Sequence, residues 1–212
     1  MKHTSKLIIG SYSNALEGRK IALCITGSVA AVECVSIARL LMRHGAEVYS
    51  MMSPMAQKII HPYLMEWATG NPCITELTGQ IEHITFAGKH DDRVDLVLIA
   101  PSTANTVGKI ANGIDDTPVT TTASSAIGAR IPVLIVPAMH ESMYEHPAVI
   151  ENIRKLRSIG VHVMSPRREE AKAKIPSPDA IVEYVMGLLG PQDFVGKEIL
   201  VTAGPTIGWI DR

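Results

Sequence analysis

The chain has 212 residues, of which 46% are hydrophobic, and its formal net charge at pH 7 is −1. This length and apolar content suffice for a globular domain with a sizeable core that needs no support from disulfides or metals. The near-neutral charge leaves no basic surplus for a nucleic-acid backbone or an anionic membrane, so we expect a small-molecule substrate, no nucleic-acid partner and no membrane partner.

We expect no export signal in the first residues, because MKHTSKLIIGSYSNALEGRK (1–20) lacks a long apolar core followed by a small-residue cleavage site. No apolar run in the chain approaches the length of a membrane span. The three cysteines, Cys24, Cys34 and Cys73, show no C-x-x-C spacing, and two of them lie in apolar segments. We therefore expect reduced, structural thiols in a cytoplasmic protein.

Short apolar runs alternate with helical patterns along the chain. The runs that predict buried strands are residues 20–26, 47–52, 95–100, 131–136, 161–164 and 198–203. The patterns that predict amphipathic helices are clearest at 29–44, 103–113 and 147–160. This alternation predicts an α/β fold with a Rossmann-like, doubly wound parallel sheet flanked by helices. Ligands bind such folds beyond the carboxyl ends of the strands, so the residues after each strand are the most informative.

The first predicted strand opens into GSVAA (27–31). Gly27 permits a tight turn, Ser28 is a good capping residue, and the N–H groups of the helix start suit a phosphate. The full G-x-G-x-x-G spacing is absent, so an ordinary strand-to-helix turn explains the segment equally well. After the second strand, Ser53-Pro54 repeats the plan of a capping hydroxyl followed by proline, which a plain N-cap also explains.

Polar residues are densest after the strand predicted at 95–100. A solvated helix start needs one capping residue, so a bound polar ligand explains this surplus better. Further along, Thr122, Ser124 and Ser125 lie among small residues and either face the same site or belong to a packed helix. The residues of the surplus are Ser102, Thr103, Asn105, Thr106 and Lys109.

Two histidines lie near predicted strands. His140 comes shortly after the strand at 131–136, between Met139 and Met143, where it either binds a carboxylate or is an ordinary surface residue. His83 lies on a short stretch of alternating character that points it opposite to Ile84, and both a structural and a catalytic role are open. No metal-ligand set and no Ser-His-Asp order stands out, so we expect neither a metal site nor hydrolase chemistry.

The pattern changes near Gly190-Pro191, where a helix ends and a short polar link leads to the strand predicted at 198–203. We therefore expect one domain over residues 1–190. Residues 191–212 are expected to be a linker and the first strand of a second, truncated domain.

Four segments, taken together, resemble the homo-oligomeric flavin-containing cysteine decarboxylase family in order and spacing. They are GSVAA at 27–31, His-Ile at 83–84, APSTANT at 100–106 and PAMHESMY at 137–144. The closing KEILVTAGPTIGWIDR (197–212) resembles the opening of a phosphopantothenate-cysteine ligase domain. The resemblance makes residues 1–190 an FMN-binding decarboxylase domain.

The resemblance implies an FMN cofactor and the decarboxylation of 4'-phosphopantothenoylcysteine to 4'-phosphopantetheine in coenzyme A biosynthesis. In the family's chemistry the flavin oxidises the cysteine thiol to a thioaldehyde, His83 is the catalytic base, and the thioaldehyde is the electron sink for loss of the carboxylate. Family members are trimers or dodecamers, which implies a homo-oligomer here. The cofactor-binding residues implied by position are Gly27, Ser28, Val29, Ala30, Ser53, Ser102, Thr103, Asn105, Thr106, Lys109 and Thr122.

Two departures from the family pattern affect the substrate side. The family's P-x-M-N-x-x-M-W segment reads PAMHESMY here, so His140, with Met143 nearby, replaces the asparagine that contacts the substrate carboxylate. The flap REEAKAKIPSPD (168–179) lacks the family's proton-donating cysteine. Lys172 or Lys174 either replaces that donor or binds the substrate phosphate.

Other functions fit the sequence less well. A flavin prenyltransferase or a peptidyl-cysteine decarboxylase shares the fold, but the ligase-like closing segment argues against both. A flavin-binding regulatory subunit of the kind that inhibits phosphatases carries acidic extensions, which this chain lacks. An NAD(P)-binding module needs an acidic residue at the end of the second strand, and Glu47 begins that strand instead.

Overall fold

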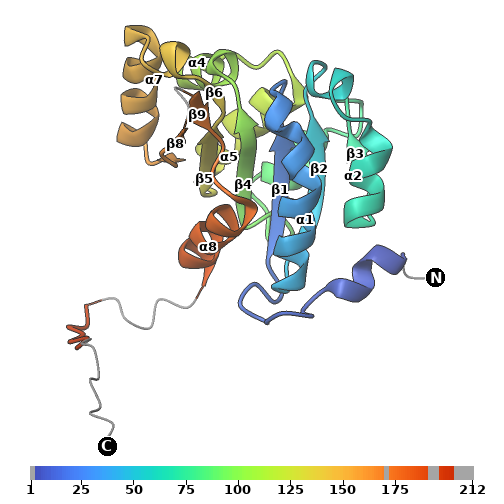
Figure 1. Ribbon diagram of the computed structural model, residues 1–212. Helices are drawn as coiled ribbons and strands as arrows, with labels where there is room; N and C mark the ends of the chain where they lie inside the picture. The colour runs from blue at the N-terminus through green and yellow to red at the C-terminus, as the bar shows by residue number, and fades with distance from the viewer. Residues whose placement is uncertain (1–2, 170–171, 191–195, 203–212) are drawn as a thin grey trace, which may run out of the picture.

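The computed structural model describes residues 3–169, 172–190 and 196–202. Its main sheet has six parallel strands in the order β3-β2-β1-β4-β5-β7 (Figure 1). The central strands are buried on both faces, which is why their sequences are continuous apolar runs. The strands are β1 (Lys20–Ile25), β2 (Glu47–Met52), β3 (Cys73–Ile74), β4 (Leu96–Ser102), β5 (Val133–Pro137) and β7 (His162–Val163).

Helices cover both faces of the main sheet. On one face α1, α2 and α8 bury side chains such as Leu41, Met65 and Val185, and Figure 1 shows α1 and α8 in front of the strands. On the other face α3, α4, α5 and α7 bury side chains such as Val107 and Ala123. The helices are α1 (Cys34–Arg43), α2 (Pro62–Thr69), α3 (Glu82–Ala87), α4 (Ala104–Ala111), α5 (Pro118–Ala129), α6 (Glu141–Tyr144), α7 (Pro147–Ser158) and α8 (Pro178–Leu189).

Local sequence sets where several helices begin. Proline is the first residue of α2, α5, α7 and α8, where its missing N–H costs nothing. The preceding His61, Thr117, His146 and Ser177 each accept a hydrogen bond from an N–H of the first turn. Three short 3-10 helices complete the helical part of the described chain: η1 (Thr4–Ile8), η2 (Val29–Glu33) and η3 (Ala56–Lys58).

A second, antiparallel sheet has the order β6-β9-β8. Its strands are β6 (Met139–His140), β8 (Arg167–Glu169) and β9 (Lys172–Lys174). Only Ala138 separates β6 from the end of β5, so this small sheet extends from the carboxyl edge of the main sheet, on the side of α4 in Figure 1.

The α/β fold with a doubly wound parallel sheet is confirmed, and the strands predicted before residue 165 all form. The stretch around His83 is instead helix α3, because spacing over so few residues cannot separate a strand from a helix whose Ala87 packs into the core. The predicted strand at 198–203 is wrong over residues 198–202, which form no ladder with any described strand and expose Leu200 by 90%. Residues 203–212 lie outside the described part of the chain.

The strand order creates one topological switch point. The chain passes from β1 through η2 and α1 on one face of the sheet, but from β4 into α4 on the other face, although β1 and β4 are neighbours. In open α/β sheets the crevice outside the carboxyl ends of two such strands is the preferred place for a ligand. Across the described residues, no helix combines the length and apolarity needed to cross a membrane.

Candidate cofactor and active site

Four strand-end loops meet at the carboxyl edge of the main sheet. Backbone hydrogen bonds join them: the Ser53 N–H donates to the Ile25 carbonyl (3.0 Å), and the Ala138 N–H donates to the Ser102 carbonyl (2.9 Å). The Thr26 N–H donates to the Pro101 carbonyl (3.3 Å), so these bonds join the loops after β1, β2, β4 and β5 into one continuous region.

Close packing surrounds the turn after β1. A Cβ on Gly27 would lie 2.3 Å from Met55 Cγ, so only glycine fits between β1 and the loop after β2. The Ser28 hydroxyl accepts from the Ala30 N–H (3.4 Å) and the Ser53 hydroxyl accepts from the Ala56 N–H (3.3 Å). Ser28 thus caps η2, whereas Ser53 stabilises the turn before η3, whose N-cap is Met55. Val29, next to Ser28, is 81% exposed.

Ser102 is a buried polar side chain at this edge that has no hydrogen-bond partner among the described residues, a property shared by Ser50 Oγ within β2 and by His83 Nδ1. It is fully buried, and its Oγ lies at the end of β4, directly before Thr103, the N-cap of α4. A buried hydroxyl without a partner is costly, because it has lost its hydrogen bonds to water. A ligand with hydrogen-bonding groups, such as the phosphate of a nucleotide, would restore them, so the site fits the flavin predicted from the sequence.

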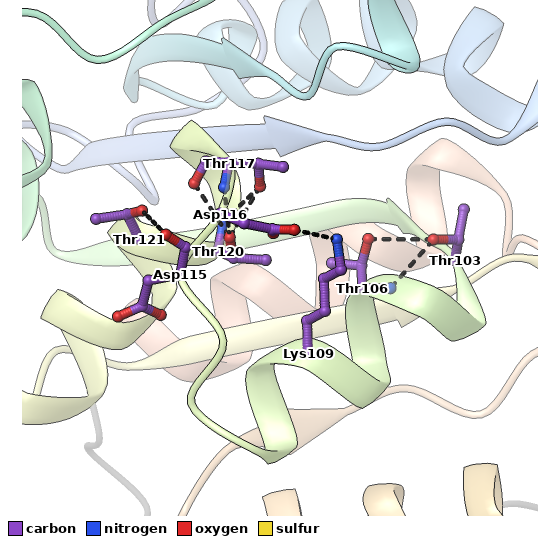
Figure 2. Close-up of polar contacts among 8 residues, drawn as sticks. All are labelled: Thr103, Thr106, Lys109, Asp115, Asp116, Thr117, Thr120 and Thr121. Carbon is purple, nitrogen blue, oxygen red and sulfur yellow. Dashed lines mark hydrogen bonds and ion pairs between the residues drawn. The ribbon is translucent and has the colours of Figure 1, made fainter.

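Several other polar side chains at α4 already contact other side chains of the protein (Figure 2). Lys109 Nζ lies 2.5 Å from Asp116 Oδ2 and holds the pKa of that carboxyl below its ordinary value. The hydroxyls of Thr103 and Thr106 lie 3.1 Å apart, and Asn105 is exposed. Figure 2 shows the Lys109 side chain reaching from α4 to the loop before α5, so its predicted role at the cofactor requires it to leave Asp116 or bind beside it.

Thr122 occupies a different environment from the other predicted cofactor-binding residues. It is fully buried in α5 and donates a hydrogen bond to Met51 Sδ (3.1 Å). Ser124 donates to Asp115 Oδ1 (2.5 Å) on the side of α5 that faces the preceding loop. These positions match the packed-helix alternative rather than contact with a ligand at the sheet edge.

The small sheet brings the predicted substrate-side residues together. In the β6–β9 ladder His140 is the register partner of Lys172, and Lys174 lies on the same strand. His140 is exposed, and its Nδ1 accepts from the Ser142 N–H (3.3 Å), capping α6, while Met143 in α6 is 49% exposed. Residues 170–171 of the predicted flap lie outside the described chain.

His83 lies in the first turn of α3 and is half-buried. Its Nδ1 is buried and has no hydrogen-bond partner among the described residues. Ile81, directly before the helix, has a φ of 49°, a left-handed conformation that β-branched residues rarely adopt and that is enriched at functional sites. His83 is therefore not held by the described protein through Nδ1, and the residue stays partly exposed.

Two buried residues near Ser102 were not predicted as site residues. Thr26 Oγ1 contacts both peptide groups that flank Ser102, and Cys34 Sγ donates to the Ala100 carbonyl (3.2 Å). Burial raises the pKa of the Cys34 thiol far above its ordinary value, which keeps it protonated as a donor. The sequence signal for Thr26 is a hydroxyl at the end of an otherwise apolar strand, directly before the glycine turn.

No group of three or more His, Cys, Asp or Glu side chains in the described ranges could hold a metal ion.

Comparisons with known proteins agree with the resemblance drawn from the four sequence segments. A family model described as flavoprotein matches residues 9–190. The chain is 56% identical over 211 residues to the coenzyme A biosynthesis bifunctional protein CoaBC of Thermococcus kodakarensis, covering 100% of this chain and 52% of the relative. It is 38% identical over 212 residues to the protein of the same name from Methanocaldococcus jannaschii, covering 99% and 51%. The chain thus spans about half the length of these relatives.

Among solved structures, the FMN-dependent cysteine decarboxylase TvaF from thioviridamide biosynthesis superposes with a TM-score of 0.62 at 28% identity. The match covers 80% of this chain and 99% of that one. The doubly wound domain described above is therefore the whole fold of that structure.

Proposed function

The chain belongs to the flavoprotein family, and from that premise we propose that it binds FMN and decarboxylates 4'-phosphopantothenoylcysteine to 4'-phosphopantetheine in coenzyme A biosynthesis. The observation that carries the proposal is the buried hydroxyl of Ser102, which has no partner among the described residues and lies at the switch point between β1 and β4. The names of the relatives support the pathway, and the TvaF structure supports the FMN cofactor. The regulatory-subunit and prenyltransferase alternatives receive no support from these names.

In this proposal the phosphate of FMN lies at the carboxyl edge of the main sheet. The Ser102 hydroxyl and the N–H groups of the first turn of α4 would donate hydrogen bonds to it, since the N-terminus of a helix favours an anion. Gly27 has no side chain, so the phosphate could come close to the backbone of the turn after β1. The remaining predicted cofactor residues, apart from Thr122, line the same edge. The bound flavin would supply the two-electron oxidation of the substrate thiol.

The chain itself would bind the substrate and move its protons. His83 is proposed to accept the thiol proton, because its ring is half-buried and Nδ1 has no protein partner in the described chain. His140 on β6 is proposed to bind the substrate carboxylate. Lys172 and Lys174 on β9, beside it in the small sheet, are proposed to bind the substrate phosphate or to return a proton.

The test compares two histidine variants in a carbon dioxide release assay with 4'-phosphopantothenoylcysteine. His83→Asn should keep its FMN but lose at least about a hundredfold in kcat, the usual contribution of a general base. The matched control is His162→Asn, which changes another half-buried histidine, on the edge strand β7. Full activity in His83→Asn contradicts the role of His83, and wild-type protein that holds FMN but releases no carbon dioxide contradicts the reaction.

We also propose that copies of the chain associate into a trimer or dodecamer. Val29, Val32 and Met55 are 81%, 59% and 54% exposed beside the site, and apolar side chains gathered in this way favour association. Light scattering on the eluted protein should give a mass that is a multiple of three chains. A monomer would contradict this part of the proposal.

The domain division and the location of the protein are further proposals. We propose that residues 1–190 are the decarboxylase domain and that 191–212 lead into a ligase domain, because the relatives are about twice as long and are named bifunctional. A cytoplasmic location fits thiols that stay reduced: Cys24, Cys34 and Cys73 are all unpaired in the structure.

A further inference from the structure

Thr26 lies where the ladder between β1 and β4 stops. The last paired residues are Cys24 and Ile99, and the register of β4 against β5 shifts between Ile99 and Ser102. Beyond this point no strand pairing with β1 fixes the path of β4. Thr26 is 1% exposed and lies where its own hydrogen bonds can fix the path of β4.

The Thr26 hydroxyl acts as donor and acceptor at once. Oγ1 donates to the Pro101 carbonyl (2.8 Å) and accepts from the Thr103 N–H (3.1 Å). The Thr26 N–H donates to the same Pro101 carbonyl (3.3 Å). One side chain therefore holds both of the peptide groups that flank Ser102.

The carbonyl group of Ser102 is also held in place, because it accepts a hydrogen bond from the Ala138 N–H (2.9 Å). The Ser102 hydroxyl, by contrast, has no hydrogen-bond partner in the described chain. Thr103, held by Thr26, caps α4 by accepting from the Thr106 N–H (3.3 Å). Thr26 thus fixes the backbone on both sides of Ser102, from which the hydroxyl projects, and the start of α4.

We infer that Thr26 is a positioning residue for the phosphate of the bound flavin: it orients Ser102 and the first turn of α4 without itself contacting the ligand. This inference rests on the proposed FMN site and deepens it. Preorganised donors bind an anion more tightly, because no ordering has to occur when the ligand arrives.

Three variants test the inference through FMN affinity, measured by quenching of flavin fluorescence in the unloaded protein. Thr26→Val keeps the shape but removes both hydrogen bonds of the hydroxyl, and Kd for FMN should rise about tenfold, as for a hydrogen bond lost. Thr26→Ser keeps the hydroxyl and should stay within about twofold of wild type. Thr69→Val is the matched control.

Thr69 is a suitable control because it has the same environment far from the site. It is 1% exposed at the end of α2, where its Oγ1 donates to the Met65 carbonyl (2.9 Å) and accepts from the Asn71 N–H (3.2 Å). Thr69→Val should lower the thermal stability as Thr26→Val does, yet leave Kd unchanged. An equal rise of Kd in both variants would mean that Thr26 acts only through general stability, and would overturn the inference.

A double variant tests whether Thr26 acts through Ser102. If it does, Thr26→Val combined with Ser102→Ala should bind FMN about as weakly as Ser102→Ala alone, rather than with two multiplied losses. Multiplied losses would overturn this route of action. If Thr26→Val does not fold, hydrogen exchange of wild-type protein still decides: the Thr103 amide should exchange as slowly as the buried amides of β4, and exchange at the solvent rate overturns the inference.

The outcomes separate the inference from the proposed function. FMN bound equally tightly by wild type and Thr26→Val overturns the inference and leaves the function standing. Wild-type protein that binds no FMN overturns both.

Discussion

A methyl group added at Gly27 is the sharpest steric perturbation that the site offers. Its carbon would lie 2.3 Å from Met55 Cγ and 2.6 Å from Met55 Cβ. The backbone at Gly27 is outside the left-handed region, so backbone strain adds nothing to this overlap in Gly27→Ala. The Cβ atom of Met55 cannot rotate away as a side-chain tip can, so the loop after β2 has to shift. Overpacking of this kind costs ~1–3 kcal/mol in the free energy of unfolding.

Urea unfolding of the unloaded protein measures this cost directly. Gly128→Ala is the control, because Gly128 lies in α5 with nothing within 4 Å of its added Cβ. That variant should be more stable than wild type by ~0.5–1 kcal/mol, since alanine favours the helix. Met55→Ala should recover part of the loss in Gly27→Ala by removing Cγ. Gly27→Ala with wild-type stability would refute the close packing of these two loops.

Three further predictions follow from the described contacts. Ser102→Ala loses no hydrogen bond to the described part of the chain, so its free energy of unfolding should stay within ~0.5 kcal/mol of wild type while FMN binds about tenfold more weakly. A large loss of stability in chemical denaturation would reveal a partner for this hydroxyl. Asp116 has its pKa lowered by Lys109 from 3.8, so its contribution to stability is present above pH 3.8 and is lost as the pH falls through the lower folded value. Thermal melts of Asp116→Asn should therefore differ from wild type near neutral pH and converge with it in acid, whereas a constant difference would contradict the ion pair. Burial raises the pKa of Cys24 to about 12 and also raises that of Cys34, so at pH 8 a thiol reagent should modify both only after urea is added.

The main sheet could be predicted from the sequence because its central strands are buried on both faces. Such strands are continuous apolar runs, and the helices between them show apolar residues at helical spacing. Short elements could not be predicted in this way. The strand β3 has two residues, and β6, β8 and β9 are strands because they pair with one another, which no local sequence pattern shows. The helix α3 was hidden for the same reason, since its six residues contain less than two turns of pattern.

The place of the site could also be predicted, because parallel strands bring all strand-end residues to one edge. Which of those residues are free to bind a ligand could not. The hydroxyls of Ser28, Ser53 and Thr103 look alike in sequence to that of Ser102. Ser28 and Thr103 cap helices and Ser53 accepts from the Ala56 N–H, whereas the Ser102 hydroxyl has no partner in the described structure. The role of Thr26 depends on the path of β4, more than seventy residues away along the chain.

The central claim, that FMN occupies the carboxyl edge of the main sheet, is tested most directly by an absorbance spectrum of the purified protein with mass analysis of whatever is released on denaturation. The spectrum of oxidised flavin, the mass of FMN and the uptake of one FMN per chain by the stripped protein are the predicted result. A colourless protein that takes up no added FMN would contradict the claim.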